Sequence, residues 1–342
     1  MHGIRYTVSR KRRHLHFAVW ACLLIAGWVT TSSAQDVKAP CASPVNFAGI
    51  RTFLSAPYVT NLDQLKADFA VVGVPFDEGT WNAPGTRYGP RELREGTVMY
   101  KSCDLSLGFY YIDGDRVVLK GKTWADLGDV ETWPTVPVQT GENITREVRA
   151  ILAKKAFPVV LGGDHSLTFP VLRAFDVPVT VIHFDAHLDT WTGAPGNLDH
   201  ASWVNRAAQL PQVKHIVQIG MRGLANDFEA RDNYLKIHST LITSEGIHRH
   251  GVEWALAQIP KSENIYITLD VDVLDPAVAP GTGTLEPGGL NFFQLDDLLT
   301  GMASKGKLVG MDVVEVDDRD HSGRTAQTAV RLIIDTLGAA FH

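Results

Sequence analysis

Residues 181–189 read Val181-Ile-His-Phe-Asp-Ala-His-Leu-Asp189, an apolar run that ends in alternating polar side chains. Successive side chains of a strand point to opposite faces, so Asp185, His187 and Asp189 share one face at the strand end. Few folds place two carboxylates and an imidazole in this way except to hold a metal ion. The stretch therefore predicts a buried strand that ends in a metal site.

Two further apolar runs end in related motifs. Leu269-Asp-Val-Asp-Val-Leu-Asp-Pro276 repeats the acidic spacing of two, and Leu161-Gly-Gly-Asp-His-Ser166 closes the other run. Buried carboxylates repel one another and are costly to desolvate unless cations compensate them, so the combined set predicts two divalent ions. The candidate ligands are His165, Asp185, His187, Asp189, Asp270 and Asp272.

Short runs rich in Val and Ile alternate with amphipathic segments along the chain. The expected strands are 69–74, 124–127, 158–161, 179–184, 215–220, 265–269 and 308–314. The expected helices are 90–100, 142–156, 166–174, 201–210, 246–258, 291–304 and 325–340. This alternation predicts one catalytic domain, residues 65–342, built as a three-layer α/β/α sandwich with a mainly parallel sheet. A (β/α)8 barrel is the alternative, and in both folds the motifs lie at the carboxyl ends of the strands.

The first 34 residues have the layout of a secretory signal peptide. Arg10-Lys-Arg-Arg13 precedes an apolar run from Phe17 to Val29, and Ser33-Ala34-Gln35 offers small residues for cleavage. A membrane anchor, the alternative, would need a longer apolar span. We expect export to the periplasm or the medium, with the general and twin-arginine routes both open. A loop-rich lead, residues 35–64, follows the signal.

The composition and charge of the chain limit the classes of molecule that it is expected to bind. The 342 residues are 45% hydrophobic and 20% charged, as in an ordinary globular enzyme, and the net charge is −6. A mildly acidic chain attracts neither nucleic acid nor an anionic membrane, whereas a small cationic substrate suits it. Cys41 and Cys103 remain after signal removal, and their pairing stays open.

A mostly oxygen ligand set with two imidazoles favours Mn²⁺ over Zn²⁺, and Ni²⁺ or Co²⁺ remains open. Two such ions can activate a water as the nucleophile. The sequence holds no Gly-x-Ser-x-Gly elbow that would supply a serine nucleophile instead. We therefore expect a metal-dependent hydrolase with two Mn²⁺ per subunit.

The ordered motifs Gly-Gly-Asp-His-Ser, Phe-Asp-Ala-His-x-Asp and Asp-Val-Asp-x-Leu-Asp-Pro resemble the signature of the ureohydrolases, which include arginases and agmatinases. The resemblance runs from about residue 69 to the C-terminus and is closest to the agmatinases. It is also the main reason to expect the three-layer sandwich rather than the barrel. It implies hydrolysis of a guanidino compound to urea and a primary amine, with agmatine as the first candidate substrate. Guanidinobutyrate, arginine and formimino compounds are the alternatives. The resemblance also implies a homo-oligomer, a trimer or a hexamer.

The resemblance also assigns roles to residues. It implies that His165 and Asp189 hold one ion and that His187 and Asp272 hold the other. Asp185 and Asp270 would bridge the two ions, and Asp189 would also hydrogen-bond the nucleophile. Glu315 resembles the carboxylate that pairs with the guanidinium, and His200 resembles the histidine that passes a proton to the leaving amine.

Residues around these motifs carry weaker predictions. Trp191, together with Trp81 and Trp203, could line the mouth of the pocket, although core packing is the commoner fate of tryptophan. Asn197 is similar to a substrate-binding asparagine of arginases, but its spacing to His200 differs. Asp164 could support the ligands or cap a helix, and His183 is expected to pack or to hydrogen-bond behind the site. From another class, a metal-binding protein without catalysis is the alternative function.

Overall fold

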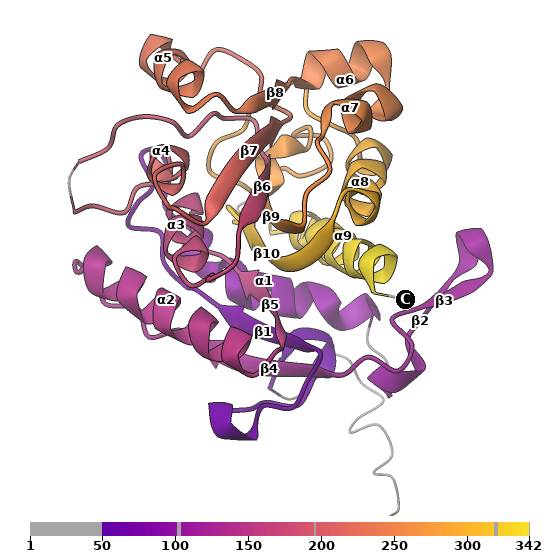
Figure 1. Cartoon of the computed structure of the whole chain (residues 1–342). Helices are drawn as coiled ribbons and strands as arrows, with labels where there is room; N and C mark the ends of the chain where they lie inside the picture. The colour runs from indigo at the N-terminus through magenta and orange to yellow at the C-terminus, as the bar shows by residue number, and fades with distance from the viewer. Residues whose placement is uncertain (1–49, 101–103, 195, 318–320, 342) are drawn as a thin grey trace, which may run out of the picture. The chain divides into compact units, whose positions relative to one another are not determined.

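The computed structural model describes residues 50–100, 104–194, 196–317 and 321–341. An eight-stranded sheet runs through the middle of this part of the chain in the order β4-β1-β5-β10-β9-β6-β7-β8 (Figure 1). Every strand pair within it is parallel. The strands are β1 (Phe69–Gly73), β4 (Trp124–Asp129), β5 (Phe157–Leu161), β6 (Val179–Phe184), β7 (Val213–Ile219), β8 (Thr240–Ile242), β9 (Asn264–Asp270) and β10 (Lys307–Val314). A separate antiparallel hairpin joins β2 (Phe109–Tyr111) to β3 (Arg116–Val118).

Helices cover both faces of the sheet because its strands are apolar on both sides. In β1, Phe69 and Val71 belong to one core cluster, and Ala70 and Val72 belong to the other. The first cluster packs under α1 (Gly89–Gly96), α6 (Ser244–His250), α7 (Val252–Gln258), α8 (Phe292–Gly301) and α9 (Arg324–Ala340). The second packs under α2 (Pro137–Ala153), α3 (Thr168–Leu172) and α4 (Trp203–Ala207). The predicted three-layer sandwich is confirmed, and the barrel alternative is wrong because β4 and β8 are open edges.

Local signals account for most boundaries. Asn291 caps α8 and forms a capping box with Gln294, and Pro137 stands in the first turn of α2. The predicted helix 246–258 is divided into α6 and α7 at Gly251, whose φ of 90° suits a residue without a side chain. The sequence did not predict the short edge strand β8 or the helix α5 (Phe228–Ile237).

Strand order brings the motifs together. β9 lies between β10 and β6, and its register pairs Asp270 with Val314 and Leu269 with Phe184. β5 lies on the other side of β10, with Leu161 beside Val313. The segments that follow these four strands therefore emerge next to one another at the carboxyl edge of the sheet.

The predicted signal peptide, Cys41 and Cys103 lie outside the described residues. The described end of the predicted lead, residues 50–64, contains two short 3-10 turns, Phe53–Ser55 and Leu62–Gln64. Among the described helices, none combines the length and the apolar character needed to cross a bilayer.

Candidate metal centre

The six predicted ligands meet at the carboxyl edge of the sheet, with Asp185 in the middle. Its Oδ2 lies 3.0 Å from Nδ1 of His165, and its Oδ1 lies 3.3 Å from Nδ1 of His187. Asp185 is completely buried. One carboxylate therefore faces two imidazoles with its two oxygens, which is the arrangement that a bridging ligand needs.

The other three carboxylates complete two donor groups. Nδ1 of His165 lies 3.4 Å from Oδ2 of Asp189 and 3.2 Å from Oδ2 of Asp270. Nδ1 of His187 lies 3.1 Å from Oδ2 of Asp272. The two groups share Asp185, so the geometry offers two adjacent positions for cations.

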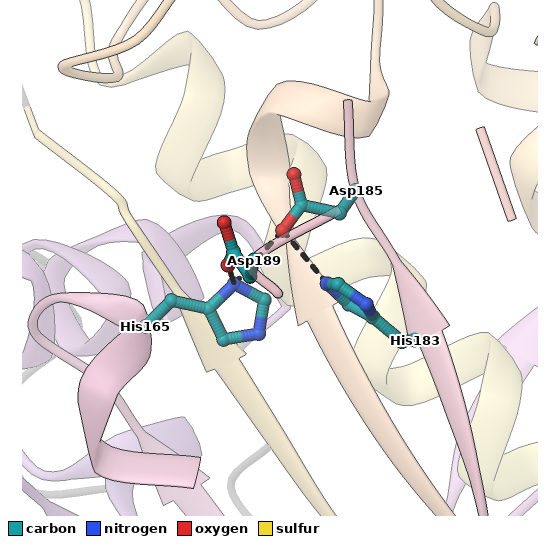
Figure 2. Close-up of side chains that lie close together, drawn as sticks. All are labelled: His165, His183, Asp185 and Asp189. Carbon is teal, nitrogen blue, oxygen red and sulfur yellow. Dashed lines mark hydrogen bonds and ion pairs between the residues drawn. The ribbon is translucent and has the colours of Figure 1, made fainter. Parts of the chain in front are cut away.

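His183 contacts the centre by a hydrogen bond, which is one of the two roles expected from the sequence. Its Nε2 is 2.8 Å from Oδ2 of Asp185. Figure 2 shows His165 and Asp189 on one side of the Asp185 carboxylate and His183 on the other. The ring of His183 is held by Gln218, whose amide lies 3.4 Å from Nδ1 and also donates to the Leu188 carbonyl. His183 therefore orients the shared carboxylate.

The electrostatics of the donors fit a pair of divalent cations. Nδ1 of His165 is buried, faces three carboxylates, and has no hydrogen-bond partner among the described residues. Burial and the charge of Asp185 raise the pKa of Asp189 well above its usual range, and burial, Asp272 and Asp185 do the same for Asp270. Without cations, the centre must therefore take up protons to limit its own repulsion.

A chain of hydroxyl groups orients His165. Its Nε2 lies 2.8 Å from Oγ1 of Thr268, which donates to Oδ1 of Asp312 at 2.6 Å. Asp312 is completely buried and also accepts from Tyr266 and Thr168. Such an arrangement fixes the imidazole so that Nδ1 faces the metal position.

Trp203 belongs to the centre and not to the pocket mouth. It is almost fully buried, its ring stacks on His165 with centroids 4.7 Å apart, and its indole N–H donates to Oδ2 of Asp189 at 2.9 Å. The hypothesis that Trp203 lines the mouth is therefore wrong. The indole instead holds two of the donors in place.

Asp189 and Glu315 both follow a strand end in a left-handed backbone conformation, with φ of 51° and 61°. This region is unfavourable for residues with a side chain, and more so for glutamate than for aspartate. A strained backbone conformation persists only where the surrounding contacts hold it in place, and such positions often lie at functional sites.

Glu315 and His200 form a pair beside the metal donors. Oε1 of Glu315 accepts from the backbone N–H of His165 at 2.8 Å and lies 3.1 Å from Nδ1 of His200. Burial opposes protonation of His200, but the hydrogen bond and charge of Glu315 prevail and raise its pKa to about 9. The Trp81 backbone N–H points at Nε2 of His200 from 3.0 Å. His200 is thus held by both ring nitrogens.

Asp164 has the capping role that the sequence offered as one of two alternatives. It caps the 3-10 turn His165–Leu167, where its Oδ1 accepts from the backbone N–H of Ser166, and its Oδ2 accepts from that of Gly79. Burial, and then the charge of Glu315, raise the pKa of Asp164 to about 7. Asp164 thus fixes the turn that presents His165.

A cleft of about 270 Å³ opens onto the centre. It is lined by Trp81, Asn82, His187, Asp189, Trp191, His200, Ala201, Ala225, Asp227, Asp270 and Thr284. Trp191 thus lies where the sequence predicted a substrate contact. Asn197 does not line this cleft. It borders a separate hollow with Leu198 and Arg206, and its carbonyl accepts from the Arg206 guanidinium, so its placement gives no support to the predicted substrate contact.

An open parallel α/β/α sheet with two adjoining sets of His and Asp donors can hold two divalent ions, which is the arrangement of binuclear metal-dependent hydrolases. Residues 67–338 match the family model described as Arginase family, and the chain belongs to this family. The chain is 33% identical over 303 residues to an agmatinase of Chromobacterium violaceum, covering 85% of this chain and 88% of that one. It is 36% identical over 306 residues to a guanidinopropionase of Pseudomonas aeruginosa, covering 85% and 92%.

The fold is shared with solved structures of the same family. The crystal structure of a hypothetical agmatinase from Burkholderia thailandensis superposes with a TM-score of 0.75 at 31% identity, covering 86% of this chain and 92% of that chain. The chain is therefore a ureohydrolase of the agmatinase branch, an enzyme that hydrolyses guanidino compounds to urea.

Proposed function

We propose that this ureohydrolase acts on agmatine, releasing urea and a diamine, with two Mn²⁺ ions per subunit. The observation that carries the proposal is the position of the buried Glu315–His200 pair directly beside the two sets of metal donors. A fixed carboxylate there can pair with a planar guanidinium through charge-assisted hydrogen bonds. The agmatinase relative agrees with this choice of substrate.

The donor geometry suggests how the residues share the two ions. His165 and Asp189 would hold one ion, His187 and Asp272 the other, and Asp185 and Asp270 both, as the contacts of Asp185 with both histidines support. When bound, two divalent ions supply an oxygen nucleophile from water near neutral pH. An oxygen-rich set with two imidazoles favours manganese, with nickel or cobalt as alternatives.

Side chains of the protein would position the substrate, orient the water and transfer the proton. Glu315 would hold the guanidinium so that its carbon faces the nucleophile, which lowers the entropic cost of the attack. Asp189, hydrogen-bonded by Trp203, would orient the attacking water. His200, which Glu315 keeps protonated, would deliver a proton to the leaving amine. The Trp81 N–H must move away from Nε2 for this transfer, because a protonated nitrogen cannot accept it.

A panel of guanidino compounds tests the substrate. Metal-loaded protein should release urea from agmatine with a higher kcat/KM than from 4-guanidinobutyrate, 3-guanidinopropionate or arginine. Formamide in place of urea, from a formimino compound, would identify the other reaction of the superfamily. If no compound in the panel yields urea or formamide, the non-catalytic alternative takes its place. The presence of both His200 and Glu315 in the site speaks against that outcome.

We further propose that the protein is exported and forms a trimer or a hexamer. The basic and apolar segments before Gln35 support export, and the oligomer follows from the family resemblance alone. Mass spectrometry of the protein from its native host should find an N-terminus near residue 35, and light scattering should give three or six subunits. An intact Met1 on the active protein would contradict export with cleavage.

A further inference from the structure

The mouth of the cleft carries a carboxylate that is outside the metal centre. Asp227 is exposed, lines the cleft, and caps α5 by accepting the Ala230 backbone N–H on Oδ1 at 2.9 Å. That hydrogen bond, and then one from the Trp191 side chain, lower the pKa of Asp227. Asp227 therefore presents a negative charge to the cleft at neutral pH, at a site fixed by the start of a helix.

Two tryptophans form the wall between this charge and the metal donors. The rings of Trp81 and Trp191 pack with centroids 5.7 Å apart at 58°, and Trp81 also lies 6.5 Å from the His200 ring. Trp81 is 59% exposed and Trp191 is partly exposed, so the paired rings offer an aromatic surface to a bound molecule. Aromatic faces attract ammonium groups and also pack on methylene chains.

The charge at the mouth of the cleft disfavours a substrate whose tail is negatively charged. Among the described residues that line the cleft, there is no lysine or arginine. Arg222, on the loop before α5, is directed at main-chain carbonyls, with contacts of 2.7 Å to Asp272 and 2.6 Å to Glu286. Its guanidinium is thus occupied within the fold. A substrate tail that ends in a carboxylate would meet the charge of Asp227 at the mouth, whereas the protonated His200 of the lining is paired with Glu315 beside the metal donors.

We propose that Asp227, with Trp81 and Trp191, recognises a positively charged tail on the substrate and so selects aminoalkyl guanidines over guanidino acids. This inference rests on the proposed guanidino hydrolase activity and specifies its substrate class. The tail amine would lie between the carboxylate and the indole faces, and the methylene chain would run along the tryptophans toward the centre.

The test compares substrates that differ only in the tail. Agmatine, 1-pentylguanidine and 5-guanidinopentanoate carry an ammonium, a methyl and a carboxylate at the same place. In Asp227→Asn, the kcat/KM ratio of agmatine to pentylguanidine should fall about fivefold, as for the loss of one partly solvated ion pair, and the relative rate with guanidinopentanoate should rise. Asparagine caps helices as well as aspartate does, so α5 should keep its start.

Asp232→Asn is the matched control, because Asp232 is an exposed aspartate of the same helix that pairs with Arg231 and does not line the cleft. It should leave the substrate ratio unchanged. A second readout is inhibition by butane-1,4-diamine, whose inhibition constant should rise in Asp227→Asn and, in wild type, at high salt. An unchanged ratio and inhibition constant in Asp227→Asn would overturn the inference, whereas absence of urea from every substrate would overturn the proposed activity itself.

Discussion

Thr268→Val tests whether the hydroxyl chain behind His165 tunes the metal centre. Valine keeps the shape and the branched carbon of threonine within β9, so the strand should persist. The substitution removes the acceptor that lies 2.8 Å from Nε2 of His165 and one of the three hydroxyl donors to Asp312. No other ligand of the centre loses a contact.

The expected magnitude follows from burial. His165 is 1% exposed, so its Nε2–H would lose its partner without gaining water, at a cost of about 1–3 kcal/mol. Loss of a supporting hydrogen bond behind a metal-binding histidine typically weakens metal affinity by about 10–100-fold, which is about 1.4–2.7 kcal/mol. The two estimates agree, so we expect affinity for one of the two ions to fall within that range.

Competition with a chromophoric chelator measures both binding steps. Thr168→Val is the matched control, because the Thr168 hydroxyl donates to the same Asp312 carboxylate and lies 3.2 Å from the Thr268 hydroxyl, whereas its hydrogen bond to the His165 carbonyl is made by the backbone N–H, which valine keeps. It should lower the melting temperature with little change in metal affinity. Metal affinity within threefold of wild type in Thr268→Val would refute the proposed role of the hydroxyl chain.

Three further predictions concern charge. Asp272→Ala should lose one equivalent of bound metal and all turnover, whereas His200→Ala should slow turnover by about 10²–10⁴ and keep the metal. Elemental analysis measures the bound metal, and urea release measures the turnover. Full activity of His200→Ala would disprove proton transfer by this residue. Metal binding should release protons, because the raised pKa values of Asp270 and Asp189 mean that the metal-free carboxylates hold protons. Calorimetry in buffers of different ionisation enthalpy counts the released protons. Zero release would contradict the conclusion that the metal-free carboxylates are protonated to limit their repulsion. Burial and Asp335 raise the pKa of Asp296 from its ordinary value of 3.8 to about 7. The unfolded chain therefore ionises first, and the fold loses stability as pH rises from the ordinary aspartate range to about 7. Asp296→Asn should therefore raise the melting temperature more at pH 8 than at pH 5, and an equal change at both pH values would contradict this.

The sequence was most informative about the fold and the metal ligands where an apolar strand pattern was followed directly by a cluster of polar residues. The apolar runs predicted parallel strands whose ends had to meet, and the motifs do meet there. The predicted alternation at 185–189 is wrong, because β6 ends at Phe184 and the loop that follows it carries Asp185, His187 and Asp189. All seven expected strands are present. The edge strand β8 was missed because three residues are too few to show a period, and it is partly exposed.

The supporting residues could not be found in this way. Thr268 and Asp312 lie 44 residues apart and touch only because β9 and β10 pair in register. The sequence did not distinguish Trp203 from the other tryptophans near the motifs. Only the tertiary structure shows that its ring stacks on His165. His183 did carry a signal, since it stands two residues before Asp185 on the same strand face.

The left-handed turns at Asp189 and Glu315 have a consequence for how this enzyme can change over time. Asparagine or glycine would relax the main chain at either position while abolishing the negative charge. Each such substitution would also remove buried contacts, since Glu315 accepts from the His165 backbone N–H and pairs with His200, and Asp189 accepts from the Trp203 indole. The backbone strain at the two turns is therefore tied to the same carboxylates that hold the neighbouring groups, so neither turn can be relaxed without leaving buried partners unsatisfied.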